Sequence, residues 1–276
     1  MTRPILRFGL IADPQYAALP PWQDRHYARS LAKLEAALDE LNRHDLAFVA
    51  TLGDVIDRDW ASFADILPIY ERARHPCRFV LGNHDFAVAS ERLAEVPAAL
   101  GLDQRYGSFV IAGIRFVLLD ATETSLFTHP QGSPAHRQAE ATLRALEEAG
   151  AINAQPWNGG MGDVQTRWLA EELGGAASRG ERVVVLSHYP VFPSNAHNMW
   201  GDAELVTRLT ASGAVVAHFS GHNHDGNYGL LGGTHFVNLT GMVETADTNA
   251  FAIVDLHADR LEIRGFGREP TRSLAL

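Results

Sequence analysis

Eight polar side chains in this sequence follow short apolar runs, and their chemical types are those that bind divalent metal ions. Carboxylates, side-chain amides and imidazoles supply the oxygen and nitrogen ligands that such cations take in proteins. Seven of the eight form a plausible ligand set, and His84 remains for another task. The eight residues are Asp13, Gln15, Asp54, Asn83, His84, His188, His222 and His224.

Taken one at a time, several of these motifs have plain structural explanations. An Asp-x-Gln after a strand is usually a turn or a cap, and His188 alone would more often be a core histidine than a ligand. The run Gly82-Asn83-His84-Asp85 is harder to dismiss, because it combines a turn glycine, a neutral oxygen donor, an imidazole and a carboxylate. The run Gly221-His222-Asn223-His224-Asp225 is stronger, because alternate histidines on an extended loop can address two adjacent metals. All of the motifs occur together, each after an apolar run, and this predicts a metal site.

The elements that must position these side chains are apolar strands alternating with amphipathic helices. Residues 5–12, 46–52 and 78–81 have the pattern of buried strands, and helices are predicted over 27–41 and 60–74. This order predicts parallel strands with right-handed crossovers. The carboxyl ends of such strands meet in one crevice, so residues far apart in sequence become neighbours there.

The second half of the chain has a different pattern. A helix is predicted over 138–149, and another begins with Asp163 as its N-cap. Residues 228–266 have the pattern of short strands without helices between them. We therefore expect two packed sheets with helices outside, in a single domain over 1–276. The remaining predicted strands cover 109–111, 115–119, 183–186 and 214–217.

Composition narrows the class of protein further. Acidic residues outnumber basic ones by 33 to 23, a net charge of −10, which argues against a nucleic-acid partner. An anionic substrate would have to be met locally, by metal or by a few arginines. The single cysteine, Cys77, excludes an internal disulfide and a thiolate zinc cage. No apolar run is long enough for a membrane span and no signal peptide is recognised, so no membrane partner and a cytoplasmic location are expected.

The motifs resemble the five blocks of the calcineurin-like metallophosphoesterases. This resemblance implies an α/β fold, a four-layer α/β/β/α sandwich of two mixed β-sheets, and a dinuclear centre in which Asp54 bridges the metals. It further implies one metal held by Asp13, Gln15, Asp54 and His224, and a second held by Asp54, Asn83, His188 and His222. The blocks are Asp13-x-Gln15, Gly53-Asp54-x-x-Asp57, Gly82-Asn83-His84-Asp85, His188 and Gly221-His222-x-His224.

Gln15 stands where most of that superfamily has histidine. Its amide oxygen is a harder ligand than imidazole, which favours Mn²⁺ or Mg²⁺ over zinc. A narrower resemblance is carried by this variant together with residues 11–16, 27–31, 157–160 and 237–251. With these segments the chain is similar to the manganese-dependent ADP-ribose/CDP-alcohol diphosphatases, so two divalent ions are expected, Mn²⁺ first, with Mg²⁺ or Fe²⁺ as alternatives. The segment between Tyr16 and the first helix is shorter than in the animal members.

The resemblance implies hydrolysis of a diphosphate bond by a metal-bridging hydroxide, with no protein nucleophile. It places His84 near the leaving oxygen as general acid, with Asp85 orienting its imidazole. A phosphate leaving group is a good one, so His84 can act more as a charge stabiliser than as an acid. Asp57 and Glu244 are expected to orient ligands or loops.

A small-molecule nucleotide substrate would be contacted at the rim of the site. Arginine binds phosphate well, but an exposed arginine is as often only solvated, and Trp157 can anchor the core instead of stacking on a base. The alternative function is a phosphodiesterase for cyclic nucleotides or phospholipid-type substrates, or a phosphomonoesterase, on the same centre. A non-catalytic binding module would be expected to lack ligands, whereas every ligand position here is filled. The candidate substrate contacts are Tyr16, Arg25, Arg29, Arg58, Trp157, Asn158 and His197.

Overall fold

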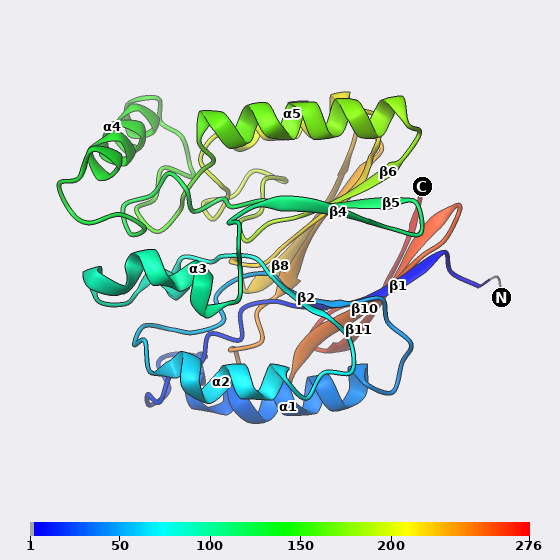
Figure 1. Cartoon of the computed structure of the whole chain (residues 1–276), viewed down its shortest axis with the longest axis horizontal. Coiled ribbons are helices and arrows are strands. Elements are labelled where there is room, and N and C mark those ends of the chain that lie inside the picture. The colour runs from blue at the N-terminus through cyan, green and yellow to red at the C-terminus, as the bar shows by residue number, and fades with distance from the viewer. Residues whose placement is uncertain (1–2) are drawn as a thin grey trace.

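The computed structural model describes residues 3–276 and shows two six-stranded sheets packed face to face between layers of helices (Figure 1). The strand order is β12-β11-β10-β1-β2-β3 in the first sheet and β4-β5-β6-β7-β9-β8 in the second. Helices α1 and α2 lie along the first sheet, and α5 lies on the opposite side of the molecule, along the second. The predicted α/β/β/α sandwich of two mixed sheets is therefore confirmed.

The first sheet has a parallel centre and an antiparallel flank. Strands β1, β2 and β3 run parallel, and the helices α1 (Ser30–Leu41) and α2 (Ser62–Tyr70) connect them. This confirms the alternation expected from the sequence. On the other side of β1, strands β10, β11 and β12 are antiparallel. The strands are β1 Leu6–Ile11, β2 Val49–Thr51, β3 Cys77–Phe79, β10 Ala250–Leu256, β11 Arg260–Gly267 and β12 Arg272–Ala275.

The second sheet is built in the same way. Strands β5, β6, β7 and β9 are parallel, while β4 and β8 pair antiparallel at the two edges. The strands are β4 Gly107–Ile111, β5 Ile114–Leu118, β6 Arg182–Leu186, β7 Val215–Ser220, β8 Asp225–Leu231 and β9 Thr234–Thr240. The helices of this half are α4 Pro134–Glu148, α5 Asp163–Ser178 and α6 Asp202–Ala211, and the short α3 covers Val96–Ala99.

An aromatic cluster joins the two sheets. The ring of Phe8 on β1 stacks on Phe48, with centroids 5.2 Å apart, and meets Phe116 and Phe219 of the other sheet edge-on at 5.3 and 6.1 Å. All four rings are buried. Burial of each such side chain is worth about 1.5–3 kcal/mol, and the edge-to-face pairs add to this. These rings thus fix the two strand layers relative to one another.

Several details differ from the prediction made from the sequence: for example, α4 begins at Pro134 rather than at residue 138, and the short α3 was not predicted. Residues 27–29 form a 3₁₀ turn, so the first α-helix begins at Ser30. Asp163 is the first residue of α5, and Gly162 is its N-cap. Asp163 therefore acts through its charge in the first turn rather than as a capping side chain. Helix α6 was not predicted, because only three of its ten residues are buried apolar ones and the periodic signal is short.

Within residues 3–276, no helix is long and apolar enough to cross a membrane.

Candidate metal centre

Five strand ends from both sheets bring the predicted ligands together. Asp54 lies in two groups whose ligand atoms are all within 4.8 Å of one another: Asp54 with His188 and His222, and Asp54 with Asp13 and His224. All five side chains are buried. The arrangement is two adjacent groups that could each hold a cation and that share one carboxylate.

Gln15 and Asn83 flank these two groups. The side-chain oxygen of Asn83 lies 2.9 Å from Nε2 of His188, and the backbone of Gln15 donates to the carbonyl of Asp54 at 2.7 Å. Both amide atoms of Gln15 and Oδ2 of Asp54 are buried without a hydrogen-bond partner among the described residues. A buried polar atom left unpaired costs about 1–3 kcal/mol, and a bound cation would remove that cost for the oxygens.

The tautomer of His188 is fixed by the backbone. Its Nδ1 lies 2.8 Å from the carbonyl oxygen of Leu52, which can only accept, so Nδ1 carries the proton. The Nε2 lone pair then points toward Asn83 Oδ1 and, at 3.4 Å, toward Asp54 Oδ2. A lone pair facing two oxygens is the arrangement that a divalent cation would stabilise.

The other two histidines are oriented by side chains. Asn158 uses its amide protons on the carbonyls of Asn153 and Ala196, so its Oδ1 must accept from Nε2 of His222 at 3.0 Å. The Nδ1 of His224 donates to Glu244 at 2.7 Å. His222 therefore has Nδ1 free to bind a metal, whereas His188 and His224 have Nε2 free.

Burial lowers the pKa of His188, His222 and His224. The imidazoles are thus neutral, the form that binds metal. Burial, together with the charge of Asp54, raises the pKa of Asp13 well above its usual range. Carboxylates this close repel one another, and a cation between them offsets the repulsion. The donor set therefore suits divalent metal ions.

The backbone is strained where the predicted ligands lie. Asp13, Gln15, Asp54 and His222 have positive φ angles of 49°, 47°, 50° and 67°. Left-handed non-glycine residues are uncommon and gather at functional sites. At Gly221 the limit is space, because a Cβ there would lie 2.7 Å from Oδ2 of Asp13. The loops are therefore shaped around the ligands.

His84 lies at the edge of the cluster, and its orienting partner differs from the expected one. Its Nδ1 is 2.5 Å from Oδ1 of Asp57, and its backbone amide donates to Asp54. Asp85, predicted to hold the ring, instead accepts from the backbone amides of Val55, Ile56 and Gly82. That prediction for Asp85 is corrected, because its carboxylate faces away into the strand-end loops.

The charges around His84 favour its imidazolium form. Burial alone would lower the pKa of His84, but the charge of Asp54 and the hydrogen bond to Asp57 outweigh it and raise the pKa. Burial would raise the pKa of Asp57, but the same hydrogen bond lowers it. Burial, with the charge of Asp54, raises the pKa of Asp85 to about 7. The pKa of His84 is thus raised, whereas the pKa values of His188, His222 and His224 are lowered.

The candidate substrate contacts fall into two sets. Arg25, Trp157 and His197 border the cluster: Arg25 lies 3.5 Å from Glu244, and the ring of His197 lies between those of His222 and Trp157, at 5.3 and 6.4 Å. Arg58 pairs with Asp57 at 3.1 Å and is more than half exposed.

The side chains of the second set are engaged in contacts within the protein. Tyr16 is buried and donates to Asp65 at 2.9 Å, and Arg29 pairs with Asp247 at 3.7 Å, where both side chains are exposed. The side-chain amide of Asn158 is used entirely within the protein. Asn158 lies 64 residues from His222 in the sequence, so the hydrogen bond between them could not be predicted from a local pattern.

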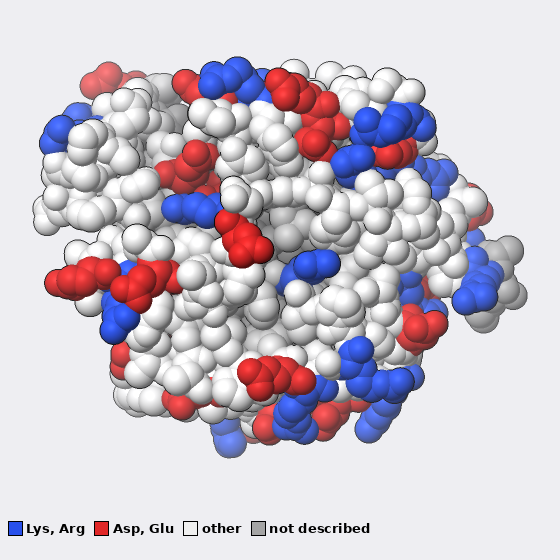
Figure 2. All heavy atoms as spheres, in the orientation of Figure 1, with Lys and Arg blue, Asp and Glu red and all other residues white. Residues whose placement is uncertain are grey.

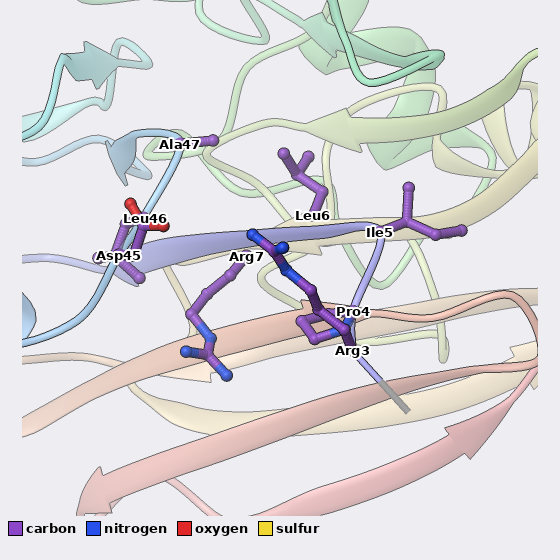
Figure 3. A pocket seen from close by; sticks show the side chains of 8 residues that line it. All are labelled: Arg3, Pro4, Ile5, Leu6, Arg7, Asp45, Leu46 and Ala47. Atoms are coloured by element: carbon purple, nitrogen blue, oxygen red, sulfur yellow. The ribbon is translucent and has the colours of Figure 1, made fainter. Parts of the chain in front are cut away.

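Two surface recesses lie at different distances from the site. One of about 490 Å³ lies at the opposite end of β1 and contains none of the predicted site residues (Figure 3). Another, of about 400 Å³, borders the site beside Arg58 and is apolar. It is lined by Leu19, Pro20, Pro21, Trp22, Tyr27 and Arg58. On the face shown in Figure 2, basic and acidic side chains are interspersed, so the described residues there form no continuous cationic track.

A double-sheet sandwich with paired carboxylate and imidazole clusters at its strand ends defines the class of dinuclear metallophosphoesterases. Residues 6–226 match the calcineurin-like phosphoesterase family, and the chain belongs to it. The chain is therefore a hydrolase of phosphoric esters or anhydrides that works with metal ions.

Comparison with individual proteins shows which members of the family this chain is similar to. The chain is 29% identical to the human manganese-dependent ADP-ribose/CDP-alcohol diphosphatase, with 97% of this chain and 92% of the relative covered. It is 28% identical to the Arabidopsis thaliana protein of the same name, with 96% of each covered. A crystal structure of a dimetal phosphatase from Danio rerio superposes with a TM-score of 0.88 at 26% identity, covering 99% of both chains.

Proposed function

We propose that the chain is a Mn²⁺-dependent hydrolase that cleaves the diphosphate bond of a nucleoside diphosphate linked to a sugar or an alcohol. The observation that carries the proposal is the buried set of candidate ligands around Asp54, among which the side-chain amide of Gln15 is unpaired within the described residues. An amide oxygen at this position favours Mn²⁺, whereas an imidazole would favour zinc. The names of the nearly full-length relatives suggest the substrate class. The products would be a nucleoside monophosphate and a phosphorylated fragment.

The proposed ligands follow from the two groups that share Asp54. One metal would be held by Asp13, Gln15, Asp54 and His224. The other would be held by Asp54, Asn83, His188 and His222. When bound, the pair of ions supplies Lewis-acid stabilisation of phosphate oxygens and lowers the pKa of water.

His84 would serve the leaving oxygen. Its Nδ1 proton is held by Asp57, so Nε2 is the nitrogen left for substrate. Because only about a fifth of the side chain is exposed, the imidazolium is partly shielded from water, which strengthens its interaction with a developing negative charge. The role is donation of a proton or a hydrogen bond from Nε2.

Arg25 would hold a phosphate at the rim. Its Nε lies 3.5 Å from the carboxylate of Glu244, which accepts from Nδ1 of His224, so the guanidinium lies beside the cluster. Glu244 keeps it there, while Arg58 lies on the other side of His84, beside Asp57.

The proposal includes one domain over 1–276 and a cytoplasmic location. Each of the two groups of proposed ligands contains residues from both sheets, so neither sheet would form the site alone. A single cysteine suits a reducing compartment.

A substrate panel tests the function. Purified protein with Mn²⁺, Mg²⁺, Zn²⁺ or no metal is assayed on ADP-ribose, CDP-choline, a cyclic nucleotide and p-nitrophenyl phosphate. We expect selective, Mn²⁺-dependent release of AMP and CMP. Cleavage of only the cyclic nucleotide or the monoester would replace the proposal with a phosphodiesterase or phosphomonoesterase on the same centre.

A further inference from the structure

Lys33 is the one lysine among the 23 basic side chains of the sequence, and it is buried in α1. Its ammonium group donates to three backbone carbonyls, those of Met242 at 2.9 Å, Glu244 at 2.7 Å and Thr245 at 2.5 Å. All three acceptors belong to the loop that joins β9 to β10.

The geometry of this contact explains why the residue is lysine. Three carbonyl oxygens converge on one point, and an ammonium group offers three tetrahedral donors from one atom. A guanidinium is planar and spreads its donors over three nitrogens, so it matches carboxylates better than such a cage. Burial, with the charge of Arg268, lowers the pKa of Lys33 to about 8, so at pH 7 all three protons are present.

The loop that Lys33 holds also contacts the candidate metal-binding residues. The amides of Met242 and Val243 donate to the carbonyls of Ala12 and Asp13 at 2.8 and 3.0 Å. The carboxylate of Glu244 accepts from Nδ1 of His224, which fixes the tautomer of that imidazole. Asn249, near the far end of the loop, donates to the carbonyl of Lys33 itself at 2.7 Å. Helix α1 and the loop are therefore tied at two points.

We propose that Lys33 is a positioning residue for the metal centre, which acts by clamping the β9–β10 loop so that Glu244 holds His224 with Nε2 toward Asp13 and Asp54. Without the clamp the loop would lose three hydrogen bonds around one buried cation. The role of His224 as a ligand rests on the proposed function. The state of its Nδ1 proton does not, and it can be observed in metal-free protein.

The first test uses Lys33→Met, which keeps the length of the side chain and removes its donors. In metal-free protein with ¹⁵N-labelled histidine, we expect the Nδ1–H signal of His224 to move or broaden. In calorimetric Mn²⁺ titrations we expect one of two binding events to weaken roughly 10- to 100-fold, the range found when a partner of a ligating histidine is removed. The other event should change little.

Two further variants separate positioning from simple loss of stability. Arg43→Met removes an exposed cation just beyond α1 and should leave both readouts as in the unmodified protein. Lys33→Arg keeps the charge with the wrong geometry and should fall between Lys33→Met and the unmodified protein. If Lys33→Met is folded, keeps the His224 signal and binds both Mn²⁺ ions normally, the proposal is overturned.

If Lys33→Met does not fold, the unmodified protein still gives an answer. Labelling with ¹⁵N-lysine yields a single side-chain signal. We expect a slowly exchanging ammonium signal whose position changes when Mg²⁺ is added. A rapidly exchanging signal that ignores the metal would overturn the proposal. A protein that lacks diphosphatase activity but shows these metal and NMR effects would contradict the proposed function alone.

Discussion

The three imidazoles of the cluster are held by three different acceptors: a backbone carbonyl for His188, an amide oxygen for His222 and a carboxylate for His224. Each acceptor decides which nitrogen is free. A carboxylate makes its imidazole a stronger ligand than a carbonyl does, because it favours partial transfer of the Nδ1 proton. The residues outside the ligand set therefore shape both proposed metal sites.

Gln15 is the position at which metal preference should be adjustable. In Gln15→His an imidazole nitrogen replaces an amide oxygen, so we expect Zn²⁺ affinity to rise about 10-fold or more relative to Mn²⁺. Competition calorimetry with the two ions measures the ratio. Gln15→Glu, which keeps an oxygen, should not raise it. An unchanged Zn²⁺/Mn²⁺ ratio in Gln15→His would mean that Gln15 is not a ligand.

The pairing of His84 with Asp57 gives a second prediction at this scale. His84→Asn should lower kcat by about 10²–10⁴ on the diphosphate substrate, the usual contribution of a general acid. Asp57→Asn should lower it less, because the amide oxygen still accepts from Nδ1. Steady-state kinetics at saturating Mn²⁺ measures both. Equal activity of His84→Asn and the unmodified protein would exclude a role in the reaction.

At the scale of elements, the site depends on how tightly the strand-end loops approach one another. A Cβ built on Gly82 would overlap the carboxylate of Asp54, and one on Gly53 would lie 2.5 Å from Nδ1 of His188. These glycines follow β2 and β3, the parallel strands whose ends face the second sheet. The close packing of these loops therefore helps to position the candidate ligands Asp54 and His188.

Gly82→Ala tests this packing. The added methyl has no space, so we expect loss of Mn²⁺ binding or destabilisation by more than about 2 kcal/mol. Gly107→Ala is the matched control, because its Cβ would point into open space on β4, and its free energy of unfolding should change by less than about 0.5 kcal/mol. Chemical denaturation and calorimetry give both numbers. Normal Mn²⁺ affinity together with an unchanged free energy of unfolding in Gly82→Ala would contradict the account.

Strand β7 carries one histidine, His218, and its environment is purely structural. His218 is buried beside Ser187, and burial lowers its pKa to about 3. The unfolded chain, with a histidine pKa near 6.5, binds a proton that the folded chain refuses, so between pH 6.5 and 3 this residue destabilises the fold as pH falls.

At pH 5 the cost from His218 should reach about 2 kcal/mol relative to pH 7.5, at about 1.4 kcal/mol per pH unit below 6.5. His218→Leu removes the titrating group, so the difference in unfolding free energy between these two pH values should shrink by that amount. Urea denaturation of metal-free protein at both pH values measures it. An identical pH difference in the variant would show that His218 does not titrate on unfolding.

Over the whole molecule, the sandwich, the parallel strands and the residues that meet at their ends could be predicted from sequence, because each apolar run stops at a polar motif such as Gly53-Asp54 or Gly82-Asn83. Pairings between distant segments could not. Asn158 and His222, or Lys33 and Met242, meet only after both sheets are packed, and no local pattern marks them. For the same reason the predicted partner of His84 was wrong: Asp85 is nearer in the sequence, but Asp57 is nearer in space.

The most direct test of the account is product analysis of ADP-ribose hydrolysis with and without Mn²⁺, in the unmodified protein and in Asp54→Asn. Asp54 is the carboxylate shared by both groups, so its loss should disable both proposed sites. We predict equimolar AMP and ribose phosphate from the unmodified protein with Mn²⁺, and a rate at least about 10²-fold lower in the variant. Absence of AMP, or undiminished turnover in Asp54→Asn, would contradict the account.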